Sequence, residues 1–69
     1  GEFGTDFEVE YTVLMAVDDG IDDVKAIQEH ILSNVRALSE DQKDATNEAI
    51  DRLVTKRMLR RQGDTVLLR

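Results

Sequence analysis

Apolar residues recur in the first part of the chain with the spacing of an amphipathic helix. Between residues 6 and 17 they fall at i, i+4, i+7 and i+8, namely Phe7, Tyr11, Leu14 and Met15. Residues with this spacing share one side of a helix, so the pattern predicts a helix over residues 6–17. Because the spacing favours packing, we interpret Phe7, Tyr11 and Met15 as core residues rather than as an exposed patch for a partner.

A second helix is predicted after the turn DDGIDD. Gly20 supplies the positive φ that ends the first helix, and Asp22 or Asp23 caps the next one. Ile21, isolated between these acids, is expected to point inward and to form a one-residue bridge to a strand. The second helix should stop around residues 34–36, with Lys25, Glu29 and His30 outside and with an apolar side of Val24, Ile27, Ile31 and Val35.

The third helix has the clearest start signal. Ser39 is followed three residues later by Gln42, the spacing of a capping box. The helix is expected from about residue 40 to residue 56 or 57, with an apolar side of Ala45, Ala49, Ile50, Leu53 and Val54. The opposite side of this helix is mainly acidic, with Arg52 at its edge. It carries Asp41, Asp44, Glu48, Asp51 and Thr55.

The last twelve residues, MLRRQGDTVLLR, predict a β-hairpin. Two short runs with β propensity flank QGD, in which Gly63 provides the positive φ of the turn. Because neighbouring strand residues point to opposite faces, Leu59, Val66 and Leu68 are expected to pack inward. The predicted fold class is therefore α+β and mainly α, with three helices followed by a C-terminal two-stranded hairpin.

Length and composition place these elements in one small domain. The chain has 69 residues and no cysteine, so it has neither a disulfide nor a thiolate metal site. It has no apolar run of about 18 residues, so no contact with a membrane is expected. Residues 1–5, GEFGT, look like translated restriction sites left by cloning, and the domain is expected to span residues 6–69. The absence of cysteine favours a reducing compartment, hence the cytoplasm.

The order of these elements resembles the winged helix-turn-helix superfamily. The residues that carry the resemblance are YTVLMAVDDG, VKAIQEHI, SEDQKDATNEAIDRLVTKRML and LRRQGDTVLLR. The stretch AIDRLVTKRMLRRQGDTVLLR is similar to the phrase that leads from the third helix into the wing of bacterial and archaeal regulators. Two features depart from the family. Its usual glycine before the first wing strand is here Arg57 or Met58, and LSNVRALSE is longer than the usual turn.

The resemblance implies a DNA-binding module of a transcription regulator or of a replication or mobile-element protein. The net charge of −6 is unevenly spread: the last 14 residues carry five cations and one acid, or +4, and residues 1–55 carry four cations and 14 acids, or −10. Acids repel phosphates, so the hairpin and the start of the third helix are the expected contacts with double-stranded DNA. The expected nucleic-acid-binding residues are Gln42, Lys43, Thr46, Asn47, Lys56, Arg57, Arg60, Arg61 and Arg69.

An alternative from a different class remains open. A winged-helix module can also bind another protein, here through the acidic side of the third helix or an apolar groove, with the hairpin arginines facing a partner's carboxylates. The resemblance also allows a homodimer that pairs through the first helix. Arginines on a strand can equally serve only to keep its edge unpaired. Substituting Arg60 and Arg61 by alanine should therefore weaken duplex binding only under the first hypothesis.

No other motif indicates chemistry. The acids Asp18, Asp19, Asp22 and Asp23 lack the oxygen spacing of a calcium loop, and helix ends account for them. His30 is the single histidine, so no zinc site is expected. Ser33 and Ser39 have no base to activate them. We expect no catalytic residue, no metal, no cofactor and no small-molecule substrate.

Overall fold

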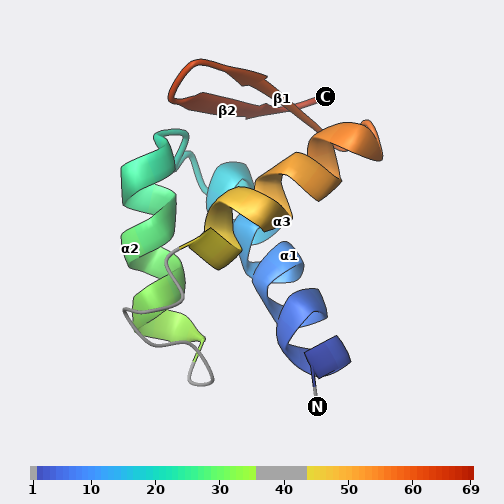
Figure 1. Cartoon of the computed structure of the whole chain (residues 1–69). Coiled ribbons are helices and arrows are strands. Elements are labelled where there is room, and N and C mark those ends of the chain that lie inside the picture. The colour runs from blue at the N-terminus through green and yellow to red at the C-terminus, as the bar shows by residue number, and fades with distance from the viewer. Residues whose placement is uncertain (1, 36–43) are drawn as a thin grey trace.

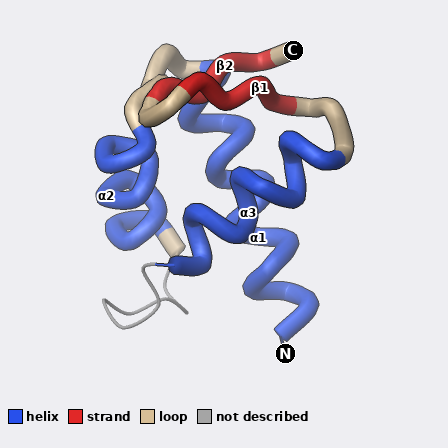
Figure 2. The backbone as a smooth tube through the Cα atoms, turned by 45° about the horizontal axis from the view of Figure 1, so that its top comes forward, coloured by secondary structure: helices blue, strands red, loops and turns tan. Residues whose placement is uncertain are grey.

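The protein folds as three helices covered at one end by a hairpin. This computed structural model describes residues 2–35 and 44–69, with side chains from residue 6 onward. The elements are helices α1 (Glu2–Asp18), α2 (Val24–Asn34) and α3 (Asp44–Thr55) and strands β1 (Leu59–Gln62) and β2 (Thr65–Leu68). The hairpin lies at the end of the bundle opposite the N-terminus (Figure 1, Figure 2). The predicted fold class, three helices followed by a two-stranded antiparallel hairpin, is confirmed.

The observed helix bounds agree only in part with those predicted from the sequence. Helix α1 begins at Glu2, so it includes residues of the predicted cloning scar. Helix α2 ends at Asn34, as expected. Helix α3 ends at Thr55, one or two residues earlier than predicted. The predicted start of the third helix and its capping box, Ser39 with Gln42, lie outside the described residues.

The core uses a different side of α1 from the predicted one. Its buried residues are Val9, Val13, Ala16 and Val17, whereas Phe7 is 71% exposed, Tyr11 56% and Met15 42%. The assignment of Phe7, Tyr11 and Met15 to the core is therefore wrong. The valine stripe has the same i, i+4, i+7, i+8 spacing, and its small side chains allow the helices to pack closely.

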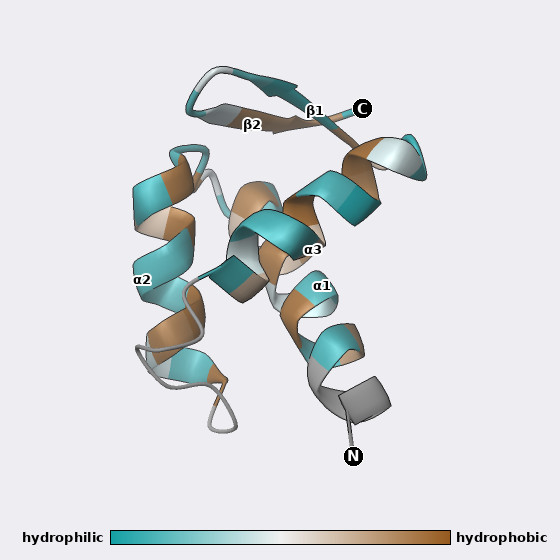
Figure 3. Cartoon of the chain, viewed as in Figure 1, coloured by the Kyte–Doolittle hydropathy of each residue, from teal (hydrophilic) through white to brown (hydrophobic). Residues whose placement is uncertain are grey.

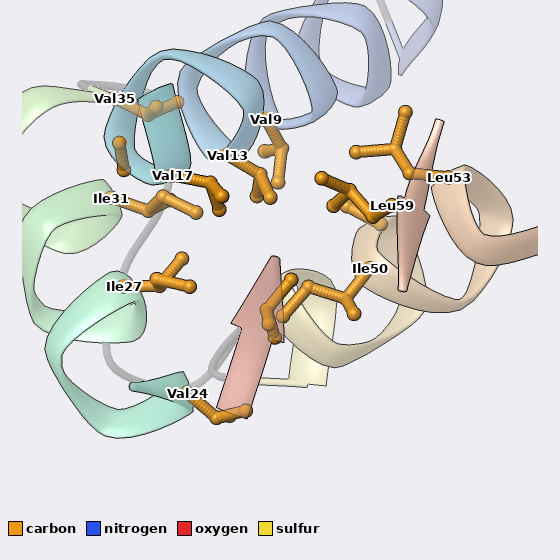
Figure 4. Packing of buried hydrophobic residues seen from close by; sticks show 13 residues of the cluster. Val9, Val13, Val17, Val24, Ile27, Ile31, Val35, Ile50, Leu53 and Leu59 are labelled. Atoms are coloured by element: carbon orange, nitrogen blue, oxygen red, sulfur yellow. The ribbon is translucent and has the colours of Figure 1, made fainter. Parts of the chain in front are cut away.

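The other elements bury the residues expected of them, with one exception. The four predicted positions of α2 are all buried, and α3 buries Ala49, Ile50 and Leu53 while Ala45 and Val54 are partly buried. Figure 4 shows Ile31 of α2 and Ile50 and Leu53 of α3 gathered around the valines of α1 in one core. Leu59 and Val66 of the hairpin are fully buried as predicted, but Leu68 is 47% exposed. Leu68 shares a strand face with Val66 but ends β2, so it has few neighbours.

Helices α1 and α3 end in the same backbone motif. After α1, the amides of Ile21 and Gly20 donate to the carbonyls of Ala16 and Val17 at 2.9 and 3.0 Å, and Gly20 has the predicted positive φ, +96°. After α3, the amides of Met58 and Arg57 donate to the carbonyls of Leu53 and Val54 at 2.9 and 3.0 Å. This pair of bonds needs a left-handed residue, usually glycine. Arg57 takes that role here, with a φ of +63°.

The hairpin is fixed to the connector between α1 and α2. Gln62 pairs with Thr65, which leaves Gly63, at φ +62°, and Asp64 as a two-residue turn. On its other side, the amide of Val66 donates to the carbonyl of Asp22 at 2.7 Å, and Thr65 forms a bridge with Asp23. Strand β2 thus lies between β1 and the connector.

The predicted bridge to a strand forms two residues later than expected. Asp23, not Ile21, pairs with the hairpin, and Ile21 is partly buried against the core. Asp23 also caps α2, as predicted, because its Oδ2 accepts a hydrogen bond of 3.2 Å from the amide of Ala26. One residue therefore joins the helix start to the hairpin.

Replacing Arg57 by glycine should stabilise the protein by about 1 kcal/mol, because glycine reaches a positive φ without the steric cost that a side chain brings. The Tm should rise by about 4–8 °C for a domain of this size. Thr55→Gly, on the exposed last turn of α3, is the matched control and should cost about 0.3 kcal/mol, because threonine is itself a poor helix former. If the Tm of the Arg57→Gly variant is at or below that of the parent protein, the backbone at Arg57 is not strained.

Candidate functional site

An apolar groove lies between α1 and the C-terminal end of α3, and we call it the α1–α3 groove. Its volume is about 430 Å³, which is within the range of binding pockets. Helix α1 lines it with Asp6, Phe7, Glu10, Tyr11 and Leu14. Helix α3 and the corner after it contribute Arg52, Leu53, Lys56 and Met58.

The groove gathers much of the exposed apolar surface. Six large hydrophobic side chains are exposed among the described residues, and three of them, Phe7, Tyr11 and Met58, line the groove. Met15 follows Tyr11 by one helical turn and extends the same stripe. Single exposed hydrophobic residues are ordinary, but a contiguous group marks a contact surface.

A three-residue ion-pair network lies in the wall of the groove. Lys56 Nζ is 2.9 Å from Glu10 Oε1, and Arg52 Nε is 3.1 Å from Glu10 Oε2. The Glu10 side chain is only 16% exposed, and the two cations come from the last turn of α3 and from the residue after it, 42 and 46 residues along the chain. The hydrogen bond from Lys56 is the main reason why the pKa of Glu10 lies below its ordinary 4.5; Arg52 adds to this, and burial opposes it. The network fixes α1 against α3.

The side of α3 turned away from the core is acidic, as predicted. Asp44, Glu48, Asp51 and Thr55 are exposed, and Figure 3 shows the polar colouring along this helix. Asp41 lies outside the described residues. Arg52, the one cation expected at the edge of this face, is bound to Glu10 instead.

Four DNA contacts were expected at the start of the third helix. The structure describes two of them, Thr46 and Asn47, and neither is fully exposed. Thr46 is 1% exposed and packs among the core residues, so its side chain does not reach the surface. The methyl group of Thr46 can pack in an apolar environment. Its spacing to Ile50 and Leu53 places Thr46 on the apolar side of α3. Asn47 is partly buried, and Gln42 and Lys43 lie outside the described residues.

The five cations expected to bind DNA near the hairpin separate into two groups. Lys56 is bound to Glu10, and Arg61 is turned toward α3. The Nε of Arg61 donates to the Gly63 carbonyl at 2.9 Å, and its guanidinium lies 3.8 Å from the Asp51 carboxylate. Arg57, Arg60 and Arg69 are exposed and form no ion pair with a described residue; we call these three the basic edge.

The strand register brings the basic edge together. Arg60 pairs with Leu67, and the Arg69 amide donates to the Met58 carbonyl at 3.3 Å, so Arg60 and Arg69 are diagonal neighbours. Both lie on the face opposite Leu59 and Val66, which point into the core. The basic edge is therefore at the open end of the hairpin, next to the corner at Arg57.

Comparison with known proteins identifies no relative: no family model, no curated protein and no solved structure matches the chain. Among the described residues, no group of His, Cys, Asp and Glu is arranged to hold a metal ion. None of the described helices combines the length and hydrophobicity that a membrane span requires.

Glu10 and the groove were not predicted from the sequence, although a signal was present. Two apolar stripes with identical spacing run along α1, one from Phe7 and one from Val9. They lie on nearly opposite sides of the helix, since two residues correspond to about 200°. A short helix in a three-helix bundle buries one side, so the second stripe predicts an exposed apolar face.

Replacing Glu10 by glutamine should lower the free energy of unfolding at neutral pH by about 1 kcal/mol, because Lys56 and Arg52 would have no carboxylate to bind. The folded-state pKa is lowered, so the stabilisation by the carboxylate is complete above the unfolded value of 4.5 and disappears as the pH falls through the folded value. Urea unfolding should show a larger difference between parent and variant at pH 7 than at pH 3. Glu8→Gln, exposed on the same helix, is the control, and equal destabilisation of both variants would contradict the role of the network.

Proposed function

We propose that this domain is a winged-helix module that binds another protein through the α1–α3 groove. The observation that carries the proposal is the grouping of Phe7, Tyr11 and Met58, each 44–71% exposed, around a groove of about 430 Å³. Residues of this kind are the anchors that protein interfaces use most.

The groove is also preorganised, which favours binding. Its floor includes Leu53, which is 1% exposed and belongs to the core, and its wall contains Glu10, held from two sides by Arg52 and Lys56. A partner would therefore meet a fixed surface and would not have to order it first.

The charges of α3 favour this proposal over DNA reading by that helix. Asp44, Glu48 and Asp51 are all exposed on the face that a recognition helix would present to the major groove. Carboxylates in that position repel phosphates and forfeit the release of counterions. A protein partner tolerates or uses such a face.

The probe for this function is a phage-displayed library of amphipathic helical peptides with random flanking residues. Enriched peptides should bind with a Kd of about 1–100 μM and should shift the amide signals of Tyr11 and Met58 in two-dimensional NMR spectra. Phe7→Ser with Tyr11→Ser should weaken binding at least about tenfold while changing stability by less than about 0.5 kcal/mol per site, because both side chains are exposed.

The matched control is Arg60→Ala with Arg69→Ala, which leaves the groove intact and should leave peptide binding unchanged. If the library enriches equally on the parent and on the Phe7 and Tyr11 variant, or if the shifts fall on the hairpin, the groove is not the binding site.

We propose double-stranded DNA as a second candidate ligand, because the basic edge has a specific feature in its favour. Arg57, Arg60 and Arg69 place three guanidinium groups, none in an ion pair with a described residue, at one end of the hairpin. This arrangement suits a phosphate backbone. Under this proposal the module would belong to a transcription regulator or to a replication or mobile-element protein.

Titration with a random-sequence duplex at low salt tests the second candidate. Arg60→Ala with Arg69→Ala should weaken binding and should reduce the salt dependence, log K against log salt, by about 1 for each phosphate that the variant no longer neutralises. Arg61→Ala is the control with a smaller effect, because Arg61 is already engaged by Gly63 and Asp51. Absence of binding at low salt, or equal weakening in both variants, would rule out the basic edge as the DNA-binding surface.

A further inference from the structure

The charges around the α1–α3 groove identify the kind of partner that fits it, and this inference rests on the proposed function. From their arrangement we infer that the occupant is an amphipathic helix with basic residues on both sides of its apolar stripe. Helix α1 supplies the first argument, since its described residues include three exposed acids, Asp6, Glu8 and Asp18, and no base.

One bank of the groove is formed by the outer side of α1. Glu8 is exposed and lies about 60° from Tyr11 around the helix, on the side away from Glu10. Asp18, also exposed, continues the negative charge at the C-terminal end of α1, where the helix dipole is negative as well. No cation on α1 offsets these charges.

The opposite bank is formed by α3. Glu48 is exposed and lies one turn before Arg52, further from the core. Between the two banks, Arg52 and Lys56 share the single carboxylate of Glu10, which leaves one positive charge in excess inside the network. The rims on either side of the network, at Glu8 and at Glu48, are negative.

The course of the groove along α1 favours a helix as the occupant. It lies between α1 and the end of α3 and presents Phe7, Tyr11 and Met58 as its apolar contacts. A helix laid along α1 can place residues at i, i+3 or i+4 and i+7 on these contacts, which is the usual way in which a helix fills such a groove. Lysine and arginine flanks would then face Glu8 on one side and Glu48 on the other.

A second copy of this chain is a poorer match. Pairing α1 with α1 of another copy would bring the exposed acids Asp6, Glu8 and Asp18 against the same three residues, with no base on either helix. Such juxtaposed like charges cost affinity, whereas a cationic helix gains it. The same side chains that attract a basic partner therefore disfavour a dimer through α1.

Three synthetic helical peptides with one leucine stripe and with lysine, glutamine or glutamate flanks are the probes. Titrated into the isotope-labelled whole chain at low salt, the lysine peptide should bind at least about tenfold tighter than the glutamine peptide, and the glutamate peptide weaker still. The advantage of the lysine peptide should vanish as salt is raised. Glu8→Lys with Glu48→Lys should also remove it, and Glu29→Lys, an exposed acid on α2, is the matched control that should not.

The outcomes separate this inference from the function it rests on. If the glutamine or glutamate peptide binds in the groove as tightly as the lysine peptide, the basic partner is wrong and the groove remains a docking site. If no peptide binds and the signals of Tyr11 and Met58 do not move, the proposed function fails as well. If sedimentation shows a dimer that Phe7→Ser with Tyr11→Ser abolishes, the occupant is a second copy and the inference is overturned.

Discussion

The rotation of α1 about its own axis is the constraint on which the other features depend. With Val9 and Val13 turned inward, Glu10 necessarily faces α3, and Phe7 and Tyr11 are left outside. The network of Glu10 with Arg52 and Lys56 stabilises this rotation, because turning α1 about its axis would separate the Glu10 carboxylate from both cations. The groove, its exposed aromatic residues and its acidic rims all follow from that orientation.

The sequence was sufficient to predict the structure of a segment that carries a single hydrophobic pattern or a residue with a distinctive backbone conformation. The α2 stripe from Val24 to Val35, the positive φ of the glycines at positions 20 and 63 and the two-stranded hairpin are local properties, and they are confirmed. It was not sufficient for α1, whose two stripes have equal spacing. The choice between them is made by contacts with residues more than 40 positions away, which no local pattern contains.

The same limit applies to the candidate site. Arg60 and Arg61 are neighbours with the same charge, but strand alternation sends one outward and the other toward Asp51. Thr46 has a polar group and was predicted at the surface, but its position on the helix puts it in the core. Met58 joins the two surfaces, because it lines the groove and its carbonyl accepts the amide of Arg69.

Strand β2 has neighbours on both sides, but β1 pairs with β2 alone among the described residues. Leu59 is fully buried, so its main chain is closed to another strand, and only at the exposed Arg61 could outward-pointing main-chain groups of β1 be reached. Arg60 and Arg61 lie on this strand, and their charges repel the same strand of a second copy and so disfavour edge-to-edge pairing. The arginines of the hairpin thus disfavour association of two domains through this strand, in addition to any contact that they make with a ligand.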